Sequence, residues 1–86
     1  MIIFVTGSAG FIGFHITRKL IREGFKVVGF DNVNSYYDIS LKEERIKELQ
    51  KESKKFGAEF IFIKGDLTDK GLLRKLFQEY SFKKVI

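Results

Sequence analysis

The chain has 86 residues and a net charge of +5; 44% of its residues are hydrophobic and 31% charged, with one histidine, no cysteine and no proline. This length allows one small domain, while the absence of cysteine excludes disulfides and thiolate metal sites, and the single histidine excludes a histidine-rich metal centre. No apolar run reaches the ~18 residues that span a bilayer and no basic segment opens the chain, so we expect a cytoplasmic protein without a membrane partner.

The basic residues are interleaved with glutamates, as at residues 42–45 and 51–55. This pattern is typical of solvated helix faces rather than of a nucleic-acid interface. We therefore expect no nucleic-acid partner, although the net positive charge would permit one.

The first predicted strand is the apolar run at residues 1–5, which suits a strand buried on both faces of a sheet. A turn with Gly7, Gly10 and Gly13 follows it directly. Gly7 would let the chain leave the strand sharply, Gly10 would let a pyrophosphate approach bare backbone, and Gly13 would let the next helix pack tightly against the sheet. The spacing predicts a dinucleotide site, and a glycine-rich turn without a ligand is the alternative.

A helix is predicted to begin near Phe11 and to end before Gly24, with its free N–H groups facing the phosphates. Its apolar residues recur at helical spacing: Phe11, Ile12, Ile16, Leu20 and Ile21. His15 lies near Lys19 and Arg22 in the sequence and is interpreted as structural rather than catalytic.

A second strand is predicted at residues 25–30, and Asp31 follows it about twenty residues beyond the turn, where a dinucleotide fold places the acid that binds the adenosine ribose. A carboxylate there would accept both ribose hydroxyls and repel a 2′-phosphate, which favours NAD over NADP. Ser8 and Ala9 in the turn offer no positive charge for an extra phosphate. Asn32 is close enough in sequence to share the ribose contact. The alternative for Asp31 is an Asx-turn or a solvated loop acid.

The loop at residues 32–38 is rich in turn formers and is expected on the ligand-binding side of the sheet. Tyr36 and Tyr37 are interpreted as pinning this loop rather than stacking on a ligand. The capping box at residues 40–43 predicts a helix from Ser40 to about Lys54. Its narrow apolar stripe consists of Leu41, Ile46 and Leu49.

A third strand is predicted at residues 58–63, followed by Asp66 and Leu67 at its tip. There an acid could accept from the adenine amino group while a leucine covers the ring; the alternative is that Asp66 supports the turn. Thr68 or Asp69 would cap a helix at residues 70–79. The buried face of that helix would consist of Leu72, Leu73, Leu76 and Phe77.

Residues 83–86 look like the opening of a fourth strand, at which the chain stops. The alternation of strands and helices predicts an α/β fold: a Rossmann-like, doubly wound parallel sheet, truncated, with strand order 3-2-1 and the start of strand 4 beside strand 1. Residues 1–86 would form the N-terminal part of an NAD-binding domain in a longer protein. We expect an unpaired sheet edge, at strand 1 or at the start of strand 4, to promote self-association.

Tyr80 and Lys84 have the Tyr-x-x-x-Lys spacing of a catalytic pair, which requires both side chains on one helical face. Here the five residues cross from a helix into a strand, where positions i and i+4 do not share that geometry. We interpret the match as chance, so the chain has no predicted catalytic residue.

Residues 6–15, together with Asp31 and Asn32 and with residues 65–67, resemble the extended short-chain dehydrogenase/reductase superfamily, and within it the nucleotide-sugar epimerases. The loop at residues 34–38 with Leu41 and Lys42 is most similar to the UDP-glucuronate 4-epimerase branch, which is associated with polysaccharide biosynthesis. The resemblance covers essentially the whole chain, which would be the first quarter or so of such an enzyme.

The resemblance implies a tightly held NAD and the epimerisation of a UDP-sugar at C4 through a 4-keto intermediate. It places Gly7, Gly10, Phe11, Ile12 and Gly13 along the pyrophosphate, Asp31 and Asn32 at the adenosine ribose, and Asp66 and Leu67 at the adenine. The catalytic residues and the UDP-sugar domain of the family lie in later segments, so we expect no turnover by this chain alone. The alternatives are a 4,6-dehydratase or decarboxylase of the same superfamily, or a non-catalytic dinucleotide-sensing module. A homodimer is the expected assembly.

Overall fold

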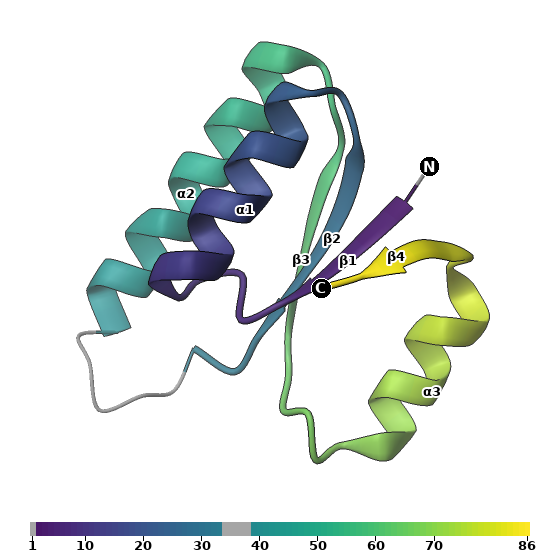
Figure 1. Ribbon diagram of the computed structural model, residues 1–86. Helices are drawn as coiled ribbons and strands as arrows, with labels where there is room; N and C mark the ends of the chain where they lie inside the picture. Colours follow the sequence, from purple (N-terminus) through teal and green to yellow (C-terminus); the bar gives the residue numbers. More distant parts are fainter. Residues whose placement is uncertain (1, 34–38) are drawn as a thin grey trace.

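Four parallel strands form one sheet with the order β3-β2-β1-β4 in the computed structural model, which describes residues 2–33 and 39–86 (Figure 1). The strands are β1 (Ile2–Thr6), β2 (Lys26–Asp31), β3 (Phe60–Lys64) and β4 (Phe82–Val85). The helices are α1 (Phe11–Arg22), α2 (Ile39–Phe56) and α3 (Lys70–Glu79). The first two helices lie on one face of the sheet and α3 lies on the other (Figure 1). The predicted fold class and strand order are therefore confirmed.

The central strand β1 has neighbours on both edges and is covered on both faces. Ile3 and Val5 pack into the core below α1 and α2, whereas Phe4 points to the opposite face, where it packs with Phe30 and Leu76. Successive side chains of a strand point to opposite faces, so a continuous apolar run can serve both cores. The prediction of a strand buried on both faces is confirmed.

The start of α2 differs from the prediction by one residue. The helix begins at Ile39 and ends at Phe56, so Ser40 lies inside its first turn instead of preceding it, and the predicted capping box does not mark the boundary. Of its predicted stripe, Leu49 is fully buried while Leu41 is 45% exposed. Tyr36 and Tyr37 lie outside the described residues.

The buried face of α1 also differs from the prediction. Phe14, Thr17 and Ile21 are buried, whereas Phe11 and Ile12 are 66% and 72% exposed. The first turn of α1 follows the loop at the carboxyl end of β1 (Figure 1), and both of these exposed side chains belong to that turn. Thr17 is tolerated in the core because its hydroxyl donates to the Gly13 carbonyl at 2.7 Å.

On the opposite face, α3 matches its predicted bounds. Asp69 is its N-cap, and its carboxylate accepts from the Leu72 amide at 3.0 Å. Leu76 is buried, but Phe77 remains 50% exposed because α3 covers this face alone and leaves the outer side of the helix open. Phe77 still contacts the Phe4 ring with its inner edge, at a centroid distance of 5.6 Å.

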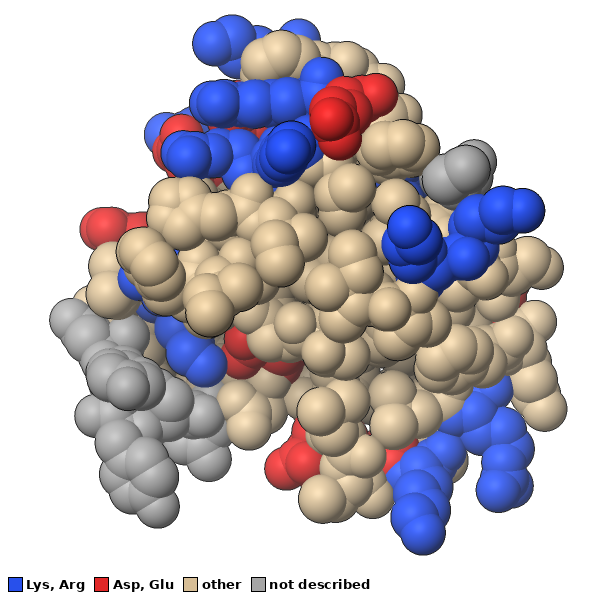
Figure 2. Space-filling model, viewed as in Figure 1, with Lys and Arg blue, Asp and Glu red and all other residues tan. Residues whose placement is uncertain are grey.

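Charged side chains are distributed around the rim of the molecule. In the view of Figure 2, lysines and arginines form separate groups near the edges, with acidic side chains beside them, and the middle of this face is largely uncharged. Within the described ranges, no helix combines the length and the apolar character needed to cross a bilayer.

Candidate functional site

The loop after β1 turns back sharply on a left-handed glycine. Gly7 has φ +65°, and its carbonyl accepts from the Gly10 amide at 3.0 Å, which closes the turn. A Cβ on Gly13 would lie 2.0 Å from the Gly7 carbonyl oxygen, so no side chain fits there. Gly7 has its predicted role of turning the chain sharply after the strand, whereas Gly13 packs against the backbone of the loop and not against the sheet as predicted.

The N-terminus of α1 opens from this loop with its amides uncapped by side chains. Gly10 is the N-cap in an extended conformation, it makes no side-chain cap hydrogen bond, and the first turn carries no acidic residue. The first N–H groups of a helix lack intrahelical acceptors and carry the positive end of the dipole. This arrangement can receive an anion such as a diphosphate.

Asp31 ends β2 directly beside the glycine loop. Its side chain is almost completely buried, and its Oδ2 accepts from the Ala9 amide at 3.1 Å. Its Oδ1 accepts from the Val33 amide at 2.8 Å, which is the Asx-turn foreseen as the alternative for this residue. Asp31 therefore supports the local turn and also lies against the loop, so the two interpretations are compatible in this structure.

Two basic residues of α2 complete this region; neither was given a site role from the sequence, although Lys42 belongs to the motif that carries the family resemblance. Lys42 Nζ donates to Asp31 Oδ1 at 3.1 Å, and Arg45 Nη1 donates to the Ala9 carbonyl at 3.1 Å. Their i, i+3 spacing places them on one helix face. The spacing was visible in the sequence, but no local signal showed that this face of α2 would lie against the glycine loop.

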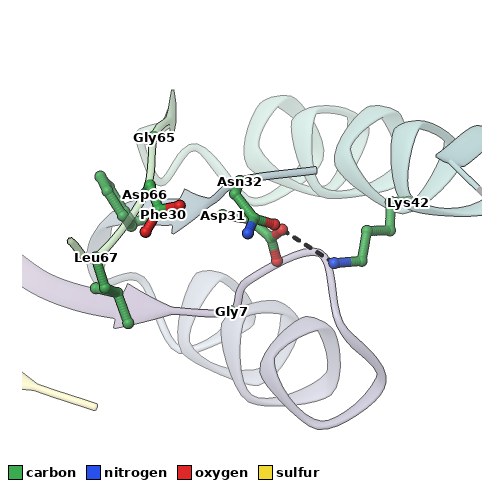
Figure 3. A pocket seen from close by; sticks show the side chains of 8 residues that line it. All are labelled: Gly7, Phe30, Asp31, Asn32, Lys42, Gly65, Asp66 and Leu67. Carbon is green, nitrogen blue, oxygen red and sulfur yellow. Dashed lines mark hydrogen bonds and ion pairs between the residues drawn. The ribbon is translucent and has the colours of Figure 1, made fainter. Parts of the chain in front are cut away.

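A pocket of about 240 Å³ lies between the ends of β1, β2 and β3 (Figure 3). Its lining residues are Gly7, Phe30, Asp31, Asn32, Lys42, Gly65, Asp66 and Leu67. In Figure 3, Asp31, Asn32 and Lys42 gather on one side of it, and Asp66 and Leu67 lie on the other. Five of the predicted site residues thus line one pocket, and the other four belong to the adjoining loop and first turn of α1.

Asp66 has a structural role that sequence reasoning had listed as the alternative. Its Oδ1 accepts from both the amide and the hydroxyl of Thr68 at 2.9 Å, and these hydrogen bonds lower the pKa of the Asp66 carboxyl below its ordinary value. Leu67 beside it is 57% exposed at the mouth of the pocket. The adenine contact of both residues stays a prediction.

Gly65 is a site residue to which the sequence analysis gave no role. Its amide donates to the Asp31 carbonyl at 3.1 Å, and a Cβ there would meet the Leu72 side chain at 2.5 Å. Gly65 thereby allows the end of β3 and the start of α3 to pack closely beside the pocket.

The two side chains of the Tyr-x-x-x-Lys match lie on different elements. Tyr80 is the C-cap of α3 and Lys84 is in β4, so they do not share a helical face. His15 lies on the exposed side of α1, where its ring contacts the edges of Phe11 and Phe14 and its Nδ1 lies 3.2 Å from Arg18 Nη2. These contacts fit the structural role predicted for His15.

Comparison with known proteins gives one family model over almost the whole chain: the model described as GDP-mannose 4,6 dehydratase matches residues 4–86. UDP-glucuronate 4-epimerase 4 of Arabidopsis thaliana is 43% identical over 84 residues, which are 98% of this chain and 18% of that protein. UDP-glucuronate 4-epimerase of Thermodesulfobacterium geofontis is 42% identical over 82 residues, which are 95% of this chain and 24% of that protein.

Among solved structures, the chain is similar to UDP-glucose 4-epimerase from Bifidobacterium longum in complex with NAD⁺ and UDP. The TM-score is 0.74 at 26% identity, and the match covers 99% of this chain and 23% of that one. The chain therefore spans less than a quarter of the length of these relatives.

Proposed function

The chain belongs to the GDP-mannose 4,6 dehydratase family, within the extended short-chain dehydrogenases/reductases, and from this we infer that it is the NAD-binding portion of a nucleotide-sugar epimerase. The observation that carries the proposal is the hydrogen bond between the Ala9 amide and the Asp31 carboxylate. It joins the two parts that a dinucleotide site requires, an open helix N-terminus for the diphosphate and an acid for the adenosine ribose.

The residues present fit such a cofactor along its adenosine half. The amides of the first turn, from Phe11 to Gly13, would receive the pyrophosphate, with the Phe11 and Ile12 side chains exposed beside it. Asp31 and Asn32 would bind the ribose at one side of the pocket. Asp66 and Leu67 would bind the adenine at the other side, since both line the same pocket.

For the full-length parent we propose epimerisation of a UDP-sugar at C4 through a 4-keto sugar, as its relatives named UDP-glucuronate 4-epimerase suggest. NAD would accept the hydride from C4, and the reduced cofactor would return it. The parent would act as a homodimer in the cytoplasm, in nucleotide-sugar metabolism leading to polysaccharide. The described residues of this chain would hold the cofactor, and we propose that the chain alone does not turn over.

A 4,6-dehydratase is the second candidate, because the matching family model is described as GDP-mannose 4,6 dehydratase. Both reactions begin with oxidation at C4 and would use the same cofactor site. Assays of the full-length parent with NAD separate them: UDP-glucuronate yields its C4 epimer if the parent is an epimerase, whereas a 4,6-dehydratase requires a sugar with a C6 hydroxyl, such as GDP-mannose, and releases one water from it.

Titration of this chain with NAD, followed in amide NMR spectra, tests the proposed function. We expect weak binding, with shifts at the amides of residues 7–13, Asp31 and Asn32, because these line the diphosphate and ribose positions. Nicotinamide mononucleotide, which lacks the adenosine half, is the control and is expected to cause far smaller shifts. NAD shifts absent from residues 7–13 would refute the proposal.

A further inference from the structure

The acid of the ribose site is already paired with a positive charge. Lys42 Nζ lies 3.1 Å from Asp31 Oδ1, and the two side chains are 13% and 4% exposed (Figure 3). Charges that are this well shielded from water interact more strongly than an exposed pair does. The local charge at the end of β2 is therefore close to zero rather than −1.

The acceptor positions of Asp31 are also largely used. A carboxylate has about four of them, and three donors already bind it: the amides of Ala9 and Val33 and the Lys42 ammonium. At most about one position is left for a ribose hydroxyl. The Asp31 carboxylate cannot accept both hydroxyls while Lys42 remains in place, contrary to the simple expectation for an acid at the end of the second strand.

These contacts change what Asp31 can discriminate. An acid at this position rejects NADP because its negative charge faces the 2′-phosphate. The Lys42 ammonium is hydrogen-bonded to the Asp31 carboxylate and so offsets its negative charge. An ammonium is also itself a ligand for phosphate. We propose that Lys42 is a specificity-determining residue of the adenosine end, which weakens the discrimination of the site against a 2′-phosphorylated cofactor. This inference rests on the proposed NAD site.

Lys42 rather than Arg45 has this effect. Arg45 donates to the Ala9 carbonyl and lies over the Phe11 ring, with 6.0 Å from its guanidinium carbon to the ring centroid. Those contacts direct it to the outer side of the glycine loop, and Arg45 is not among the residues that line the pocket. Lys42 is the described basic residue that lines it.

The test is the ratio of the Kd for NADP to the Kd for NAD, measured by amide NMR titration of the whole chain. Lys42→Met is expected to raise this ratio about tenfold, since removal of a unit charge a few Å from a phosphate changes its affinity by at least that order. Lys42→Arg keeps the charge and is expected to hold the ratio within about threefold of the unsubstituted chain. The amides of Ala9 and Val33, which donate to Asp31, report whether the carboxylate stays in place in each variant.

Lys54→Met is the matched control, because it removes the same charge from the same helix about 18 Å away along its axis. It is expected to leave the ratio unchanged. A ratio in Lys42→Met that is unchanged or lower overturns the inference, as does an unsubstituted chain that binds NAD but shows no NADP binding at the same concentrations. If NAD itself causes no shifts, the proposed function fails first and the inference fails with it.

Discussion

At the scale of single residues, the glycine loop packs so closely against the first turn of α1 that Gly13 has no space for a side chain. Gly13 approaches the Gly7 carbonyl so closely that a Cβ would lie 2.0 Å from the oxygen. Ser8 within the loop is fully buried, and its hydroxyl has no hydrogen-bond partner among the described residues. A methyl group is thus excluded at Gly13 in the first turn of α1, and the Ser8 hydroxyl in the loop makes no hydrogen bond among the described residues.

Gly13→Ala is expected to destabilise the chain by about 2–3 kcal/mol, because the loop or α1 must move to accept the methyl group. Urea unfolding followed by circular dichroism measures the loss. Gly71→Ala in α3 is the matched control, since the nearest atom to its Cβ would be 3.7 Å away. This substitution is expected to leave the free energy of unfolding unchanged or to raise it by as much as about 1 kcal/mol, because alanine replaces glycine in a helix. Equal effects of the two substitutions would contradict the close contact.

Ser8→Ala is expected to be neutral or to stabilise the chain by up to about 1 kcal/mol, because it removes a buried hydroxyl that makes no hydrogen bond. Thr17→Val makes the comparable change at a buried hydroxyl that donates to the Gly13 carbonyl, and it is expected to cost about 1 kcal/mol. Urea unfolding of both variants measures whether their stabilities differ in this way. A clear loss of stability in Ser8→Ala would show that its hydroxyl has a partner.

Asp66 is expected to titrate below the ordinary carboxyl pKa in the folded chain, because two hydrogen bonds from Thr68 stabilise its ionised form. A group with a depressed folded pKa stabilises the fold above its unfolded pKa, and that stabilisation is lost as the pH falls through the folded value. The shift of the Thr68 amide with pH reports the titration. In Thr68→Val the hydroxyl donor is gone and the backbone donor remains, so the Asp66 pKa should rise part of the way; an unchanged pKa would contradict this account.

At the scale of elements, α1 and α2 are joined by an ion pair with very unequal exposure. Arg22 Nε donates to Glu52 Oε1 at 2.8 Å, and the Arg22 and Glu52 side chains are 48% and 6% exposed. The arginine also lies over the Phe56 ring near the end of α2. The pair fixes the two helices against each other above the shared core.

Arg22→Met is expected to lower the free energy of unfolding by about 1–2 kcal/mol, because it leaves the buried Glu52 carboxylate without its partner. The loss is smaller than for a fully buried pair, since solvent screens the half-exposed arginine. Lys26→Met is the control, since the Lys26–Glu59 pair is more open, with side chains 33% and 59% exposed. Its loss is expected to be below about 0.5 kcal/mol. Urea midpoints of both variants measure the difference, and equal losses would refute a special role for the inter-helix pair.

The order and type of the elements could be predicted from local patterns, because apolar runs, glycines and the Asp69 cap each act within a few residues. The exposure of Phe11 and Ile12 could not be predicted that way. Helical periodicity shows which residues share a face, but not how far the helix extends past the sheet. The pairing of Lys42 with Asp31 is likewise non-local, since it depends on where α2 packs.

At the scale of the whole molecule, β4 covers one edge of β1 and itself forms an edge of the described sheet. Val85 and Ile86 there are 53% and 42% exposed. The sequence predicted strand 1 or strand 4 as the open edge; in the structure β4 pairs with β1 and forms one edge of the described sheet, and β3 forms the other. An open edge offers unpaired backbone groups, while lysines on it oppose pairing with a second copy.

We expect weak self-association of the chain through β4, and sedimentation over a range of concentrations measures it. High salt should strengthen the association, because it screens the repulsion between Lys83 and Lys84 of facing copies. Val85→Lys should reduce it. A strictly monomeric profile at high concentration and high salt would contradict the expectation.

The contacts of α2 have a further consequence for cofactor engineering. Lys42 and Arg45 hold the Asp31 carboxylate and the Ala9 carbonyl from a single helix face. A shift of α2 by one residue would move both side chains about 1.5 Å along the axis and turn them by about 100°. An insertion or deletion between Arg45 and the buried Leu49 would therefore alter both contacts at once, because it would rotate Lys42 and Arg45 away from the face of α2 that packs on the core.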